Sequence, residues 1–421
     1  MTETNPPKLS AVIAIRVFLP FAMGYFLSYA FRVVNAVIAP DLTAALALDA
    51  ADLGLLTSTY FITFATFQLP LGMLLDRYGP RRVESALLLL AVAGAALFSV
   101  AGNTSTLIVG RGLIGLGASA CLMASFKAFV LWFPHERLPL VNGCIMAAGG
   151  LGALAATAPV EGTLAFLDWR GLFAALAVAT LAASATILLV VPERKDAAAA
   201  GPGLAEQIKG VGEIFRSGLF WRMAPLTVAS QSSFLAIQGL WTGPWLADVG
   251  GLARESVAQS LLTVAAAMTV GFLVIGVFTD RVSRLGIKPI NVAAGGMFAF
   301  MVAEALIIAS FAAGGLLLPV WIAFGFFGTT GIISYAALSQ RFPAVLAGRL
   351  NTGLNLLVFV GASLFQWGIG VVINLWPAGA DGAYPVIAYQ VAFGMVLVLQ
   401  LGGLGWFLIS PVLVRSVRIG P

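Results

Sequence analysis

Charged residues are scarce in this sequence: they make up 10% of its 421 residues, whereas 60% are hydrophobic. Together with a mean hydropathy of +0.98, this composition excludes an ordinary soluble domain and predicts a polytopic membrane protein. The two cysteines, Cys121 and Cys144, both fall in apolar runs, which excludes a disulfide framework. The single histidine, His135, has no second ligand close to it in the sequence, so no metal site is predicted.

The motifs of several chemistries are also missing. The sequence has no Walker A loop, no nucleophile elbow and no zinc-ligand spacing, and its glycine clusters fall inside apolar runs. We therefore expect neither an enzyme nor a cofactor. The formal charge of +5 does not indicate nucleic acid as a partner, because the basic residues are not gathered on one surface.

The apolar runs that are present are long enough to cross a bilayer, which takes about 20 residues per helix. The sequence predicts twelve helices near 12–39, 53–74, 83–102, 106–132, 140–163, 170–191, 221–246, 257–279, 289–311, 316–338, 350–374 and 387–411. The longest polar interruption lies between Pro192 and Ser217. We therefore expect an all-α membrane protein with two six-helix bundles, at 1–191 and 221–421, joined by a cytoplasmic linker at 192–220.

Basic residues follow the alternation that these spans impose. Of the 23 basic residues, 18 fall on loops or tails of one side, and only Arg170 and Arg254 fall on the other. Since cytoplasmic loops are rich in Lys and Arg, both termini are predicted to be cytoplasmic. The polar segment from Met1 to Ser10 indicates a retained tail and not a signal peptide. Compact loops favour a multi-pass protein of a bacterial inner membrane.

One charged stretch, running from Gly72 to Val83, separates two apolar runs. Its pattern resembles the loop between helices 2 and 3 of the major facilitator superfamily, and a weaker copy begins 204 residues later. This resemblance implies two pseudo-symmetric six-helix bundles, alternating access, and a conformational latch at these loops. A duplicated chain encloses its own pathway, so a monomer is expected. The predicted latch residues are Gly72, Asp76, Arg77, Gly79, Arg81 and Arg82 in the first copy and Gly276, Asp280 and Arg281 in the second.

Three basic residues remain inside the spans, where a charge is costly and often functional. Arg111 begins a run that includes Gly115 and resembles the helix-4 motif of the superfamily, so it has either a packing role or a role in coupling. Lys127 is close enough to the end of its helix to reach water. Arg32 lies nine residues before Asp41 and is too deep for that. It needs an anionic partner or an aqueous cavity.

The surroundings of Arg32 resemble helix 1 of the organophosphate:phosphate antiporters, in which an arginine eight residues before a proline helps to bind phosphate. Here Pro40 follows Arg32 by eight residues. The second half departs from that pattern, because residue 236, the counterpart of Arg32, is alanine. A carboxylate on an apolar or ring-bearing body therefore fits at least as well as a phosphoester. The expected substrate-binding residues are Arg32, Asn35, Tyr29, Lys127, Gln238, Trp241 and Asn355.

The sequence contains few features that indicate how transport is coupled to an energy source. The spans contain two candidate carboxylates, Glu161 near an outer end and Glu304 in the ninth helix. Either a proton or a counter-anion could therefore be the coupled ion. The favoured hypothesis is a secondary transporter that moves a small organic anion. The alternatives are a proton-coupled exporter of drugs or metabolites and a membrane sensor that uses the transporter fold.

Overall fold

The computed structural model describes residues 11–134, 137–193, 204–309, 314–342, 344–380 and 382–410. Several sequence predictions concern positions outside these ranges. They are the tail from Met1 to Ser10, the loop residue His135, the start of the linker with Arg194 and Lys195, and the last basic residues, Arg415 and Arg418.

The described part of the chain is helical almost throughout. The first half consists of α1 (Ala11–Val33), α2 (Asn35–Leu46), α3 (Ala50–Thr66), α4 (Gln68–Ser99), α5 (Thr104–Ala118), α6 (Cys121–Trp132), α7 (Leu138–Ala155), α8 (Ala158–Leu164) and α9 (Trp169–Val190). The linker contains α10 (Leu204–Phe215), a helix that the sequence analysis did not anticipate. The second half consists of α11 (Gly218–Ala236), the π-helix η3 (Ile237–Trp241), α12 (Thr242–Asp248), α13 (Arg254–Arg284), α14 (Pro289–Ile308), η4 (Gly314–Leu316), α15 (Leu317–Gly328), η5 (Thr329–Ile332), α16 (Ile333–Ser339), α17 (Ala344–Ile373) and α18 (Val386–Ile409).

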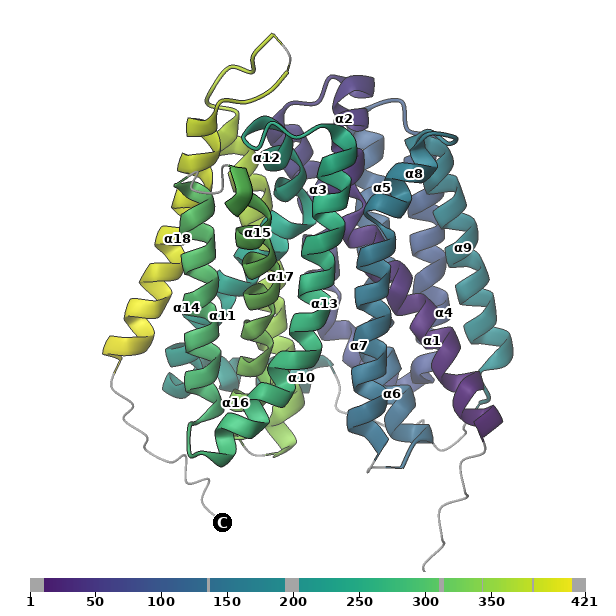
Figure 1. Ribbon diagram of the computed structural model, residues 1–421. Coiled ribbons are helices and arrows are strands. Elements are labelled where there is room, and N and C mark those ends of the chain that lie inside the picture. The colour runs from purple at the N-terminus through teal and green to yellow at the C-terminus, as the bar shows by residue number, and fades with distance from the viewer. Residues whose placement is uncertain are drawn as a thin grey trace, which may run out of the picture.

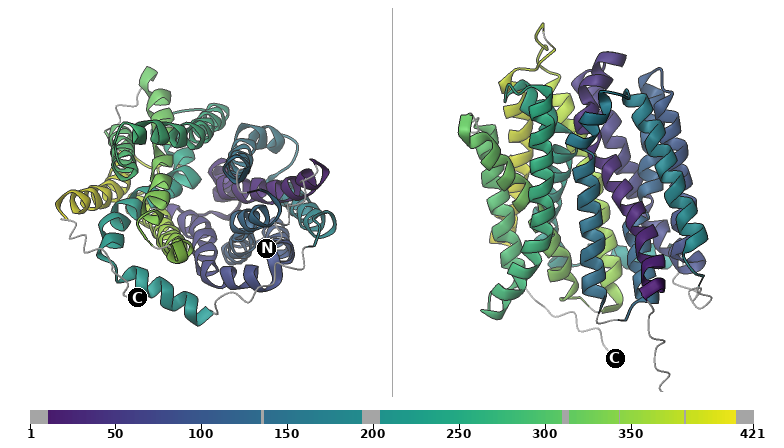
Figure 2. Two further views of the ribbon diagram at one scale, coloured as in Figure 1. Left: turned by 90° about the horizontal axis from the view of Figure 1, so that it is seen from below. Right: turned by 45° about the vertical axis from the view of Figure 1, so that its right-hand side comes forward.

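Two bundles of helices stand side by side. Figure 1 shows α1 to α9 on one side and α11 to α18 on the other, and Figure 2, viewed from below, shows α10 lying across one end. We call this end, which also carries Gly79 and Leu285, the linker end. The opposite end, which carries Asp49, Asp168 and Arg254, is the far end. The first residues of α1 and the last residues of α18 both lie at the linker end (Figure 1).

Ten helices of the described residues are long and apolar enough to cross a membrane, and they coincide with ten of the twelve predicted spans. The other two predictions, 53–74 and 221–246, fall on segments that the structure interrupts. The first is divided between α3 and α4 at Phe67, and the second contains the π-helix η3. Phe67 keeps right-handed helical angles (φ −87°, ψ −8°), so the chain continues in the same direction through that break. The structure therefore has twelve membrane-crossing segments in two bundles.

The turn of the Gly72–Val83 stretch forms as expected. Gly79 has φ 78° and ψ 160°, which separates the part of α4 that precedes it from the part that follows. Only glycine adopts such angles without strain. The next residue, Pro80, has the fixed φ that suits the first turn of a helix. This short reversal keeps the charged side chains together at the linker end.

The outermost helices expose large apolar side chains. Leu189 at the end of α9 is 77% exposed, and Leu408 at the end of α18 is 71% exposed. Helices whose backbone groups are bonded internally can present such side chains to lipid without cost. The lipid bilayer is thus the environment that this surface fits.

Candidate functional site

The two halves meet along α3 and α17. The Asn374 side chain donates to the Asp49 carboxylate (3.0 Å) at the far end of this seam. The Ser363 hydroxyl donates to the Ser58 carbonyl oxygen (3.1 Å) further along it. Towards the linker end, the Asn355 side chain donates to the side-chain oxygen of Gln68 (3.3 Å). The seam thus joins the halves over most of the length of α3.

Ion pairs close the far end across the halves. The Arg254 guanidinium at the start of α13 donates to both oxygens of Asp41 on α2 (2.8 and 2.6 Å). Its Nε donates to Glu161 of α8 (2.6 Å). Among the described residues, all ion pairs between the two halves lie in this cluster. The structure is therefore in a state whose far end is closed, and Glu161, a predicted coupling residue, is part of that closure.

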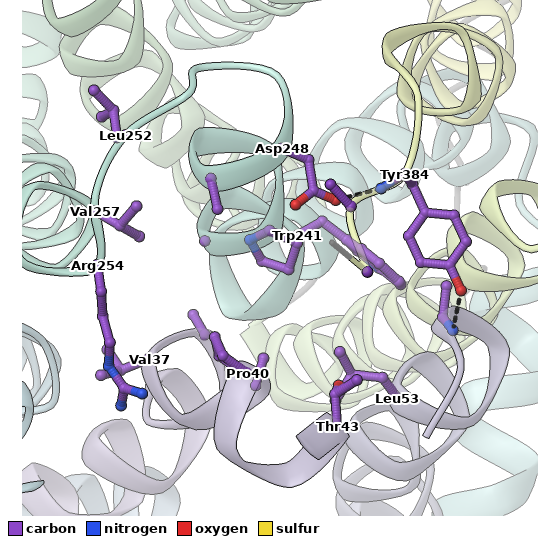
Figure 3. Close-up of a pocket in the computed structure, with 18 of the residues that line it drawn as sticks. Val37, Pro40, Thr43, Leu53, Trp241, Asp248, Leu252, Arg254, Val257 and Tyr384 are labelled. Atoms are coloured by element: carbon purple, nitrogen blue, oxygen red, sulfur yellow. Dashed lines mark hydrogen bonds between the residues drawn. The ribbon is translucent and has the colours of Figure 1, made fainter. Parts of the chain in front are cut away.

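A cavity of about 490 Å³ lies at this far end, lined by residues that include Pro40, Trp241 and Leu252 and by Arg254 and Glu161 themselves. Figure 3 shows Arg254 on one side of it and Asp248 and Tyr384 on the other. The Tyr384 hydroxyl accepts a hydrogen bond from the Ala50 amide (3.1 Å). Partial burial, together with nearby carboxylates, raises the pKa of Tyr384, so this hydroxyl stays neutral.

Deeper in the molecule, Arg32 lies near the end of α1. Helix α1 ends at Val33 and α2 begins at Asn35, and Val34 between them keeps helical angles (φ −53°, ψ −32°), so the first span continues through it. The Arg32 side chain is buried, with 6% of its surface exposed. Four aromatic rings surround its guanidinium: the Cζ atom lies 4.5 Å from the centre of the Tyr29 ring, 6.0 Å from Tyr60, 5.6 Å from Phe64 and 5.4 Å from Phe359.

This aromatic cage leaves the charge of Arg32 without an anion. Within the described residues no carboxylate forms an ion pair with Arg32, and its Nε has no hydrogen-bond partner. The faces of aromatic rings attract a cation, but each contributes only about 0.5–2 kcal/mol. Phe359 belongs to α17, so the cage includes a residue of the second half. An anionic group that reached this point would meet a guanidinium whose charge no carboxylate among the described residues balances.

The second half is irregular at the corresponding place. The counterpart of Val34, 204 residues later, is residue 238, which lies inside the π-helix η3. The missing Cβ of Gly239 in this π-helix would lie 3.7 Å from the Arg32 carbonyl oxygen. The π-helix of the second half therefore packs against the first span beside Arg32. Gly and Pro mark such places in a sequence, but a π-helix has no periodicity signal of its own.

The other predicted substrate-binding residues surround this region in different ways. Gln238 is buried in η3. The Trp241 indole donates to the Gln366 carbonyl oxygen (3.0 Å), and the Asn35 side chain donates to Thr57 (3.0 Å). Asn355 contacts Gln68 across the seam and accepts from Tyr335 (3.4 Å). Their roles in binding a substrate stay predictions.

Lys127 has a partner elsewhere. Its ammonium pairs with the carboxylate of Asp76, which lies just before the Gly79 turn. The structure thus joins one predicted substrate residue to one predicted latch residue. The Arg32 cage, as the structure shows it, does not include the Lys127 ammonium.

The remaining latch residues differ between the two copies. In the first copy the Arg81 Nε donates to the Leu188 carbonyl oxygen (2.9 Å), Arg82 pairs with Glu193, and Arg77 lies over the Tyr78 ring. In the second copy Asp280 pairs with Arg284 on its own helix (2.8 Å). Arg281 and Gly276 are exposed on the same helix. A Cβ on Gly276 would meet nothing within 4 Å.

Arg111 is buried completely and supports the backbone beside Arg32. Its Nη1 donates to the Phe31 carbonyl oxygen (2.7 Å), and its Cζ lies 5.0 Å from the centre of the Tyr60 ring. Gly115, one turn further along α5, lies against α3: a Cβ there would be 2.8 Å from the Tyr60 Cα. This geometry favours the packing role of the helix-4 motif.

Two buried carboxyl groups have opposite surroundings. Glu304 accepts from the Gln400 side chain (2.5 Å) and from the Ser233 hydroxyl (3.2 Å). Glu84 is equally buried, but in the described part of the chain its oxygens have no N–H or O–H donor, and its hydrogen-bond partner is the Cys121 thiol, a weak donor. The sequence analysis missed Glu84 because it lies at the start of the predicted span 83–102, where a charge would ordinarily reach water. Only helix packing reveals its burial.

Comparisons with known proteins agree with this architecture. The model of the Major Facilitator Superfamily matches residues 21–366. The multidrug resistance protein MdtL of Escherichia coli strain K12 is 29% identical over 358 residues, which are 80% of this chain and 84% of MdtL. The probable sulfoacetate transporter SauU of Cupriavidus necator is 28% identical over 157 residues, which are 37% of this chain and 36% of SauU. None of these matches tests the resemblance of helix 1 to phosphate-ester antiporters.

Solved structures give the same fold. A bacterial homologue of the human lysosomal transporter Spinster, in an inward-facing and unoccupied conformation, has a TM-score of 0.75 at 14% identity and covers 94% of this chain and 96% of its own. A D-xylose-proton symporter has a TM-score of 0.70 at 16% identity and covers 92% of this chain and 97% of its own. The family match over most of the sequence and the two six-span bundles together establish that this chain belongs to the Major Facilitator Superfamily.

Proposed function

We propose that this chain is a secondary transporter of small organic anions and that Arg32 is the group that binds the anion. Membership of the superfamily makes it a multi-pass membrane transporter and not an enzyme. The observation that carries the substrate class is the buried Arg32 guanidinium, which has aromatic neighbours but no carboxylate among the described residues.

The chemistry of the site suits a carboxylate or sulfonate at least as well as a phosphoester. A guanidinium binds two oxygens of one planar or tetrahedral anion through parallel hydrogen bonds. The rings of Tyr29, Phe64 and Phe359 offer apolar surface for the rest of the molecule. A relative named as a probable sulfoacetate transporter supports this class, although the match covers only part of each chain.

The topology and domain limits belong to the same proposal. We infer that the linker end faces the cytoplasm of a bacterial cell, because the basic residues of the loops gather there. The bundles then span 1–191 and 221–421, with the linker at 192–220, and the closed far end faces outward. The pathway lies between the halves of one chain, which is consistent with a monomer.

The test is ligand-dependent thermal stabilisation of the purified protein. The panel contains sulfoacetate, other carboxylates and sulfonates, phosphate esters, inorganic phosphate and lipophilic cations. We expect an organic anion to raise the melting temperature of the wild type. Its affinity should fall about 10- to 100-fold in Arg32→Ala, since a hydrogen bond to a charged group contributes about 1.5–3 kcal/mol. Arg32→Lys keeps the charge but loses the fork, so it should also bind more weakly.

Arg284→Ala is the matched control, because Arg284 is an exposed arginine paired within its own helix. It should bind the anion as the wild type does. Unchanged affinity in Arg32→Ala would contradict the anion site. Stabilisation by lipophilic cations alone would favour the second candidate, a drug exporter, for which the match to MdtL over 80% of the chain is the supporting observation.

A further inference from the structure

Glu84 is a carboxyl group with no explained role in this fold. It lies on α4, five residues after the Gly79 turn, and none of its surface is exposed. The Cys121 thiol, a weak donor, is the side chain that hydrogen-bonds it, and neither carboxyl oxygen has an N–H or O–H donor among the described residues. Native proteins give nearly all buried polar groups a good hydrogen-bond partner, so a buried carboxyl held only by a thiol indicates a functional constraint.

The neighbours of Glu84 come from two other helices. Gly24 of α1 lies directly against it: the absent Cβ of Gly24 would collide with the carboxyl oxygen and would lie 3.7 Å from the Ile187 Cδ1 of α9. The Cys121 thiol, at the start of α6, lies beside the carboxyl. Within the described residues, Cys121 is the ionisable group that acts on Glu84, and α1 presents Gly24 to it. A thiol and apolar groups cannot compensate a carboxylate.

An ionised carboxylate in such a place is strongly disfavoured, and the group takes up a proton instead. We propose that Glu84 is a proton-binding site of this transporter: it carries a proton in the far-end-closed state and releases it when the helices around it rearrange. The proton comes from water and returns to water, and the carboxyl group alternates between its neutral and its anionic form. The proposal rests on the alternating states of the proposed function.

The position of Glu84 connects this proton to the rest of the cycle. The segment between α5 and α6, Ser119 and Ala120, interrupts the fourth span just before Cys121. The Ser119 carbonyl oxygen accepts from the Gln68 side chain (3.3 Å), and Gln68 in turn accepts from Asn355 of the second half. The helix that packs on Glu84 through Gly24 also carries Arg32. A change in the packing around Glu84 therefore reaches both the seam and the anion site.

The closed state buries Glu84 between a thiol and apolar groups, so it favours the protonated form. A state in which water reaches Glu84 favours the carboxylate. Low pH should then stabilise the far-end-closed state, and high pH should favour opening of the far end.

The experiment needs no substrate. Spin labels are attached at Ala45→Cys on α2 and Gln259→Cys on α13, two exposed far-end positions, in a background with Cys144→Ser. Electron paramagnetic resonance distances between them are recorded from pH 5 to pH 9. We expect the open-to-closed ratio of the parent protein to rise at least tenfold over this range. In Glu84→Gln, which is neutral at every pH, it should change less than twofold.

Glu84→Asp keeps a titratable group and serves as the second variant. Its open-to-closed ratio should still depend on pH, with the midpoint of the change at a different pH. Arg32→Ala should keep the pH response, so loss of anion binding and loss of proton binding are separate results. A pH-independent parent protein, or a Glu84→Gln variant that follows the parent, would overturn the proposal. A response that disappears instead in Glu161→Gln or Glu304→Gln would also overturn it and assign the proton to that carboxyl.

Discussion

At the scale of single residues, the three cations inside the spans have three different environments. Arg32 is surrounded by rings, Arg111 bonds a backbone carbonyl oxygen beside it, and Lys127 pairs with Asp76. An embedded charge needs such a partner because hydrocarbon cannot solvate it. Aromatic rings balance the charge of a guanidinium less than a carboxylate does. Of the three cations, Arg32 is therefore the one that we expect to bind a substrate anion.

The Lys127–Asp76 pair gives the latch a testable form. Both side chains are partly exposed (25% and 32%), so the pair contributes about 0.2–1 kcal/mol. We expect Asp76→Asn to change the balance of open and closed states by about two- to fivefold, and to leave anion affinity within about twofold. The spin-label distances and the thermal-shift titration measure these two quantities.

Lys127→Met should reproduce the shift of Asp76→Asn if the ion pair is the cause. Asp280→Asn, in the second copy of the motif, breaks only a pair within one exposed helix and is the control. Identical distance distributions in Asp76→Asn and the parent protein would count against the latch.

At the scale of elements, the seventh span widens into the π-helix Ile237–Trp241, whereas the first span keeps helical angles through Val34. Irregular helices near the middle of a membrane are typical of transporter binding sites, because backbone groups there can face a cavity. In this chain the π-helix packs beside Arg32, which supports the same location for the substrate.

The far-end ion pairs are the elements that hold α13 against α2 and α8. Arg254→Ala removes the contacts to Asp41 and Glu161 together. Since Arg254 is 42% exposed, each pair is screened and contributes at most about 1 kcal/mol. We therefore expect the population with an open far end to increase about two- to tenfold. Distances between labels at residues 45 and 259 measure this change.

Arg284→Ala removes an arginine from the other end of the same helix and should leave the distances unchanged. High salt should reproduce part of the effect of Arg254→Ala, because it screens exposed pairs. If Arg254→Ala kept the closed distance distribution, the ion pairs would not be the closing element.

At the scale of the whole molecule, the α3–α17 seam decides how the halves can move. Gly54 of α3 faces the backbone of α17: a Cβ there would lie 2.8 Å from the Gln366 carbonyl oxygen and 3.3 Å from the Trp367 Cα. Backbone atoms cannot turn aside as a flexible side chain can. The closed far end therefore requires a glycine at this position.

Gly54→Ala should disfavour the closed state and shift the population towards an open far end, with a lower melting temperature for the closed protein. Gly402→Ala, where a Cβ would meet nothing within 4 Å, is the matched control and should leave both unchanged. Wild-type distances and melting temperature in Gly54→Ala would show that the seam tolerates separation.

The sequence by itself determined the number of spans, their order and the position of the Gly79 turn. Hydropathy is a local property, summed over about 20 neighbouring residues, and glycine and proline mark a reversal wherever they occur. The internal offset of 204 residues also follows from the sequence, as do the three cations within the spans. These features suffice for the superfamily and for the prediction that Arg32 binds the substrate.

Only the tertiary structure decided which groups meet. Asp76 and Lys127 are 51 residues apart, and nothing local indicates that they pair. Glu84 is buried against Gly24 and Cys121, which belong to two other helices. The π-helix Ile237–Trp241 lies in an apolar run whose sequence predicts a regular helix. Partners, burial and helix irregularity depend on the packing of distant segments, whereas hydropathy reports only that each segment prefers the membrane.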